Sequence, residues 1–112
     1  MSEDLNSVVL QGHLASDAEL RVFDSGTRML RLLVTTRMVK PHRRVDVIPV
    51  QAWADDMTGF DQLAELVKGD ELQLHGTLQR RYWEAPDGRR SRMEVTAISW
   101  FRIDRHEGDE EE

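Results

Sequence analysis

Arginine and aromatic side chains gather in the stretch QRRYWEAPDGRRSR, residues 79 to 92. Five of the chain's fifteen basic residues lie there, around the pair Tyr82 and Trp83. Arginine can hold a phosphate through two parallel hydrogen bonds, and its planar group also stacks on flat rings. Proteins that bind single-stranded nucleic acid combine cations that follow the phosphates with aromatic rings on which unpaired bases stack. These residue types therefore indicate a nucleic-acid-binding hairpin.

A second basic cluster, residues 37 to 44, precedes Trp53. Strand alternation places Gln51 beside Trp53, and Arg81 beside Trp83, on faces opposite the apolar residues that supply the core. A tryptophan on such a face is an interface residue or a stacking platform; the alternative, above all for Trp53 and Trp100, is a ring that closes the barrel. The candidate nucleic-acid-binding residues are Trp53, Trp83, Arg81, Arg80, Tyr82, Arg89, Arg90, Arg37, Lys40, Arg43 and Arg44.

Catalytic and metal-binding patterns are missing from the sequence. The four histidines form no close pair, and no cysteine is present to complete a zinc site. The acids of the segment DDMTGFD lack the spacing of a calcium loop and are better explained as helix caps. There is no glycine-rich phosphate loop before a helix and no serine elbow. We therefore predict no catalytic residue, no metal, no cofactor and no enzymatic activity.

The net charge of −6 hides an uneven distribution. Seven of the 21 acidic residues lie in residues 1–4 and 107–112, which leaves fourteen acidic against fifteen basic residues between them. We expect a polar N-terminal end (1–4), one domain (5–104) and an acidic tail (105–112). The tail either keeps the protein soluble or acts as a phosphate mimic that competes with nucleic acid for the arginines. No signal peptide or apolar membrane span is visible, so a cytoplasmic location and no membrane partner are expected.

Period-2 alternation of apolar residues predicts five strands, and one segment has a helical stripe. The helix is expected between Thr58 and Gly69, with Thr58 or Asp61 as its N-cap and Gly69 at its C-terminal end. Pro49 indicates an edge or a bulge in the third strand. Five strands with a helix between the third and the fourth predict an all-β, five-stranded OB-fold Greek-key barrel. The predicted strands cover residues 8–14, 29–37, 45–53, 71–83 and 92–103.

The chain resembles bacterial single-stranded DNA-binding proteins. The opening LNSVVLQGHLASDAELR, the run VDVIPVQAW, and the segment LAELVKGDELQLHGTLQRRYW with its glycine-bearing hairpin carry the resemblance over about residues 5–103. It implies an OB barrel that binds single-stranded DNA without catalysis in replication, recombination or repair, as a homotetramer or homodimer associated with the bacterial nucleoid. By position, Trp53 and Trp83 match aromatic stacking sites and Arg81 matches a cationic one.

Two departures from the family pattern affect what the resemblance implies. Val47 stands where an aromatic residue is common, and the Arg37–Lys40 loop has no aromatic residue, so binding is expected to be weaker and more electrostatic. The chain is identified as a short form, since DRHEGDEEE follows the barrel almost directly, without the family's long linker or apolar tip. Partner recruitment through such a tip is therefore not expected.

Sequence-tolerant binding of single-stranded DNA is the leading hypothesis. The alternatives are an OB-fold protein-interaction module or replication accessory factor with weak nucleic-acid binding, and an RNA-binding OB domain of the cold-shock kind. The strands lack the dense aromatic cluster that the RNA-binding alternative requires. The first strand, VVLQGHL, is the predicted interface of a homo-oligomer.

Overall fold

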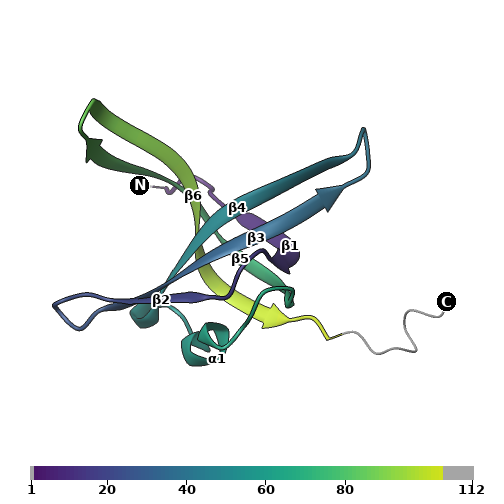
Figure 1. Cartoon of the computed structure of the whole chain (residues 1–112), viewed down its shortest axis with the longest axis horizontal. Helices are drawn as coiled ribbons and strands as arrows, with labels where there is room; N and C mark the ends of the chain where they lie inside the picture. Colours follow the sequence, from purple (N-terminus) through teal and green to yellow (C-terminus); the bar gives the residue numbers. More distant parts are fainter. Residues whose placement is uncertain (1, 105–112) are drawn as a thin grey trace.

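Six strands form one strongly curved sheet, and a short helix lies below it (Figure 1). The computed structural model describes residues 2–104. The elements are β1 (Val8–Leu14), β2 (Glu19–Val22), β3 (Arg28–Met38), β4 (Arg44–Trp53), the 3₁₀ turn η1 (Ala54–Asp56), α1 (Phe60–Ala64), β5 (Glu71–Ala85) and β6 (Gly88–Arg102).

The sheet closes on itself because its first strand also pairs with a strand near its other edge. The strand order is β1-β5-β6-β4-β3-β2, and β1 pairs in addition with β3. All neighbours are antiparallel except β4 and β6, which meet in parallel over Val50–Val95 and Gln51–Thr96. This topology, with α1 between β4 and β5, confirms the predicted OB-type barrel. The short strand β2 was not predicted because all four of its residues are exposed and show no alternation of burial.

The core consists of one face of each long strand. Leu30, Leu32 and Val34 alternate with outward-facing residues along β3, and all three are almost completely buried. From α1 and the turn after it, Phe60, Leu63 and Leu66 join the same cluster and cover one end of the barrel. Burying a large aliphatic side chain contributes about 1.5–3 kcal/mol, so this alternation drives the closure of the barrel.

Trp100 belongs to this framework. The ring is partly buried against the core, and its Nε1–H donates a hydrogen bond of 3.2 Å to the carbonyl oxygen of Gly59. The structural explanation considered for this tryptophan is therefore confirmed.

Two glycines allow strands to approach one another closely. A Cβ atom on Gly12 of β1 would lie 2.1 Å from the carbonyl oxygen of Thr35 on β3, and a Cβ on Gly76 would lie equally close to that of Thr96. Gly12 is one residue before the pair His13–Thr35, which closes the barrel. Gly76 lies at a register shift in β5, after which the β5–β6 hairpin leaves the barrel.

The predicted helix is too long, and its predicted caps are wrong. α1 begins after Gly59, which is its N-cap, and no side chain caps it; Asp61 instead pairs with Arg28 at 3.1 Å. The helix ends early: the N–H groups of Glu65 and Leu66 donate to carbonyls three residues back, and those of Lys68 and Gly69 donate to Asp17 Oδ1 and to the Leu14 carbonyl instead of continuing the helix. Gly69 has the predicted left-handed backbone, with φ of +94°, but in the turn before β5 rather than at the helix end.

Two further details of the strand prediction can be compared with the structure. Pro49 pairs with Leu33 of β3 and lies one residue before β4 meets β6, so its other side is outside that ladder, although β4 is an inner strand of the sheet and not an edge strand. Strand alternation puts Leu78 on the same face as Leu72 and Leu74 and so predicts it in the core, but it is 44% exposed and that prediction is wrong. Its side of β5 is correct, since it pairs with buried Val95, but it lies where the hairpin begins to leave the barrel.

We predict that Gly12→Ala destabilises the fold by about 1–3 kcal/mol, because the added methyl group clashes with the β3 backbone and the closure must shift. Urea unfolding would measure the change, with an unchanged m-value. Val45→Thr is the control, since this exposed β4 position should change stability by less than about 0.5 kcal/mol. Equal midpoints for the two variants would show that the close approach is not needed.

Candidate nucleic-acid interface

The β5–β6 hairpin presents two chemically different faces. Its two-residue turn, Pro86 and Asp87, confirms the predicted turn and sets the register. Cross-strand pairs then place Arg81 opposite Arg92 and Trp83 opposite Arg90 on one face. The other face carries Arg80 opposite Met93 and Tyr82 opposite Ser91, and the guanidinium of Arg89 lies 4.7 Å from the Tyr82 ring centre. The predicted site residues of the hairpin are therefore divided between two faces.

One of these faces borders a groove that we call the arginine groove. It has a volume of about 310 Å³ and is lined by four arginines from four strands and one tryptophan: Arg21, Arg31, Arg81, Arg92 and Trp83. Arg21 and Arg31 lie on β2 and β3 and form no salt bridge within residues 2–104. The groove therefore offers unneutralised positive charge beside an aromatic ring that is 40% exposed.

A buried carboxylate orients the other two arginines. Glu94 is 4% exposed, and its Oε2 accepts hydrogen bonds from Arg92 Nε at 2.8 Å and from Arg81 Nη1 at 3.4 Å. Burial alone raises the pKa of Glu94, but the hydrogen bonds and charges of Arg92 and Arg81 outweigh it, so the pKa lies below its usual value. Glu94 therefore stays ionised at neutral pH and holds both guanidinium groups at the side of the groove.

A chain of polar side chains fixes the hairpin to the barrel beside this groove. Gln51 Nε2 on β4 donates to Thr96 Oγ1 at 3.0 Å, and this hydroxyl donates to Gln79 Oε1 at 2.7 Å. The three residues come from β4, β6 and β5. Strand alternation places Gln51 on the face of Trp53 and Gln79 on the face of Trp83, so these hydrogen bonds connect the two faces.

The two predicted aromatic platforms lie in different surroundings. Trp83 lies near the hairpin tip, with the guanidinium carbon of Arg81 6.0 Å from its ring centre. Trp53 ends β4 and stacks on Phe23 of the β2–β3 turn, with ring centres 5.9 Å apart and planes at 21°. Both rings are outside the core, as predicted, but one side of Trp53 is already covered.

The second predicted basic cluster lies on the β3–β4 hairpin, which projects away from the β5–β6 hairpin (Figure 1). Arg37, Lys40, Arg43 and Arg44 are all exposed there, and none lines the arginine groove. Arg44 pairs with Asp46 at 2.8 Å. On the other hairpin, Arg90 pairs with Asp87 of the turn. The structure thus brings Arg81, Trp83 and Arg90 together on one face of the hairpin and leaves the other predicted cations apart from them.

The sequence-based prediction of the site missed five residues: Arg21, Phe23, Arg31, Arg92 and Glu94. Arg31 alternates with buried Leu30 and Leu32, so strand parity could have placed it on the outward face with Gln51, its partner across β4. Arg21 and Phe23 could not be placed, because β2 has no recognisable pattern. Glu94 looked like an ordinary exposed acid, and its burial depends on the pairing of β5 with β6.

Within residues 2–104 the structure shows no cluster of three or more acidic or histidine side chains that could hold a metal ion, and no helix long and apolar enough to cross a membrane. The strand order and the basic, aromatic outward face define an OB-fold protein.

The chain belongs to the single-strand binding protein family, whose model matches residues 5–102. It is 37% identical over 103 residues to the "Single-stranded DNA-binding protein" of Thermus thermophilus and 28% identical over 101 residues to that of Treponema pallidum. These matches cover 90% and 86% of this chain but only 37% and 56% of the relatives.

A solved structure described as "Plasmodium falciparum SSB complex with ssDNA" matches with a TM-score of 0.80 at 16% identity. It covers 93% of this chain and 99% of that one. At this identity the likeness establishes the fold.

We predict that Glu94→Gln lowers stability at pH 7 by about 1–2 kcal/mol, because two charge-assisted hydrogen bonds weaken while both arginines keep partial access to water. The folded pKa is lowered, so this stabilisation is complete above the unfolded pKa of about 4.3 and is lost as pH falls through the folded pKa. Wild type should therefore approach the variant in strongly acidic solution.

Urea unfolding at several pH values measures this difference, and Glu84→Gln, at an exposed position of the same hairpin, is the control. A difference between wild type and Glu94→Gln that is independent of pH would contradict the ionised pair.

Proposed function

We propose that this protein binds single-stranded DNA without catalysis and with little regard to sequence. The observation that carries the proposal is the arginine groove, where four guanidinium groups surround a hollow next to an exposed indole ring. Cations beside a flat ring suit a strand whose phosphates and unpaired bases are both accessible. The family membership and the names of the relatives support the same ligand.

The residues of the groove make different contacts with the DNA strand. Arg21 and Arg31, which have no acidic partner in the described chain, neutralise phosphates. Arg81 and Arg92 are held by Glu94 and present their remaining N–H groups in fixed directions. Trp83 stacks on a base, and each such contact contributes about 1–3 kcal/mol. Trp53, backed by Phe23, is the second platform.

We also propose that the protein acts as a homo-oligomer. The outward face of β1, β5 and β6 exposes Val9 and Phe101, which are 61% and 56% accessible. Gln11 and Gln73 lie between them and are joined by a 2.9 Å hydrogen bond. Such a face can pair with a second copy, and linked copies bind one strand more tightly through their high effective concentration.

The same apolar face is the specific observation that favours the second candidate function, an OB-fold protein-interaction module or replication accessory factor. In the leading proposal the protein serves replication, recombination or repair in the bacterial cytoplasm, in association with the nucleoid. The acidic tail and its competition with DNA lie outside the described residues, and recruitment of enzymes through that end is not part of the proposal.

We predict that Trp83→Ala weakens oligo(dT) binding by about 1–3 kcal/mol, because one stacking platform is lost. Fluorescence anisotropy of a labelled oligo(dT) would measure the affinity. Tyr82→Ala is a matched control, because Tyr82 belongs to the same strand but faces away from the groove. If the two variants bind alike, or if Tyr82→Ala is the weaker binder, the strand does not lie along the arginine groove.

We predict that Val9→Glu reduces the assembly to monomers, because a charge on the apolar face cannot be buried against another copy at acceptable cost. Sedimentation velocity at micromolar concentration would show the change in mass. Val45→Glu, at an equally exposed β4 position, should leave the mass unchanged. If the wild-type protein is a monomer, the homo-oligomer proposal is wrong, but the proposal for the arginine groove and its test are unaffected.

A further inference from the structure

A second basic hollow lies where β1 pairs with β3. It has a volume of about 370 Å³ and receives side chains from three separate segments: the imidazole of His13 on β1 and the cations of Arg37 on β3 and Lys68 in the turn before β5. Thr35, which pairs with His13 across the closure, adds a hydroxyl group. Two cations, with ring N–H and hydroxyl groups that can donate hydrogen bonds, suit an anion in a small hollow.

The charges of this hollow are only partly balanced. Neither Arg37 nor the ammonium group of Lys68 forms a salt bridge or side-chain hydrogen bond in the described part of the chain. The acid facing the hollow is Glu71, whose Oε1 lies 3.8 Å from His13 Nε2 and whose side chain is 11% exposed. The backbone N–H of Lys68 donates to Asp17 Oδ1 at 2.9 Å, which fixes the turn that carries the ammonium group.

One face of β3 connects this hollow with the arginine groove. Arg31, Leu33, Thr35 and Arg37 alternate with buried residues and therefore share the outward face. Arg31 lines the groove and Arg37 lines the second hollow, and six residues of strand separate them by roughly 20 Å.

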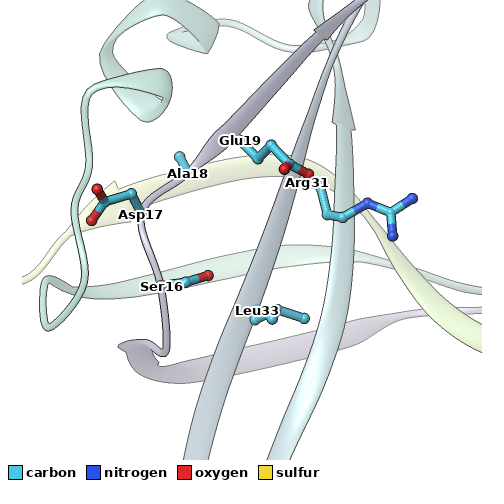
Figure 2. Close-up of a pocket in the computed structure, with 6 residues that line it drawn as sticks. All are labelled: Ser16, Asp17, Ala18, Glu19, Arg31 and Leu33. Carbon is cyan, nitrogen blue, oxygen red and sulfur yellow. The ribbon is translucent and has the colours of Figure 1, made fainter.

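A third hollow of about 430 Å³ occupies the interval between these two arginines. Figure 2 shows Ser16 and Leu33 beside this middle hollow together with the carboxylates of Asp17 and Glu19, while the guanidinium of Arg31 extends away from Asp17. The outward face of β3 has a cation at each end and an apolar side chain between them. Because the two carboxylates repel a phosphate, this arrangement suits a strand with phosphates at the two arginines and a base over Leu33.

We infer that His13, Arg37 and Lys68 form a second phosphate-binding site, which holds the backbone of the same single strand several nucleotides beyond the arginine groove. This inference rests on the proposed function. Val9 and Gln11 of the face proposed for homo-oligomers lie on the same side of β1 as His13, so the two surfaces adjoin at His13, whereas Arg37 and Lys68 come from other segments. Short strands occupy the arginine groove alone, and only longer strands reach the second site.

The experiment measures the affinity and salt dependence of oligo(dT) from about 4 to about 16 nucleotides, the range of site sizes known for OB folds. The variant is Arg37→Gln with Lys68→Gln. The control is Arg28→Gln with Arg102→Gln, which removes the same charge from two arginines already paired with Asp61 and Asp70.

The shortest strands should bind the variant and the control equally. With the longest strands the variant should lose a salt slope of about 1.4, or about 0.7 for each lost phosphate contact, and most of the affinity that added length provides. Equal length dependence in variant and control overturns the second site and leaves the proposed function intact. Equal losses for short and long strands also overturn it, because the cations would then act with the groove. Failure of wild type to bind any strand overturns both.

Discussion

The pairing of β1 with β3 is the constraint on which the rest of the structure depends. It covers only His13–Thr35 and Leu14–Val34, yet it turns a sheet into a barrel. A closed barrel buries one face of each strand, so the side chains that alternate with the core residues must point outward. The arginine groove and the hollows along β3 are consequences of that division, and the small size of Gly12 permits it.

The groove illustrates how a basic surface is organised in a chain that is acidic overall. Four arginines close to one another repel, and a single buried carboxylate relieves this repulsion by taking hydrogen bonds from two of them. Because Glu94 is buried, its charge acts through a medium of lower dielectric and fixes Arg81 and Arg92 more strongly than a surface acid could. Arg21 and Arg31 are left for the ligand. Glu94 thus orients Arg81 and Arg92, while Arg21 and Arg31 remain available to neutralise phosphates.

The sequence predicts most of the fold, because long alternating strands and the Pro86-Asp87 turn are local signals that closure reinforces. It predicts the α1 region poorly, since the backbone N–H groups of Lys68 and Gly69 bond to Asp17 and Leu14, which are far away in the sequence, instead of continuing the helix. For the site, the alternation of side chains along the strands correctly places Trp53 and Trp83 outside the core. It cannot bring Arg21 beside Trp83, because that proximity depends on how the β5–β6 hairpin crosses the barrel. Residues from four strands meet at the groove, and no local pattern encodes their meeting.

The most direct test of single-strand binding on this outward face is a titration of the protein's own tryptophan fluorescence. Trp83 and Trp53 lie outside the core, whereas Trp100 is fixed against it by its bond to Gly59, so stacking on the outward face should change the signal. We expect quenching by oligo(dT) that is reversed at high salt, with no comparable response to oligo(U) or duplex DNA. An unchanged signal with all three nucleic acids at low salt would contradict it and favour the protein-interaction module.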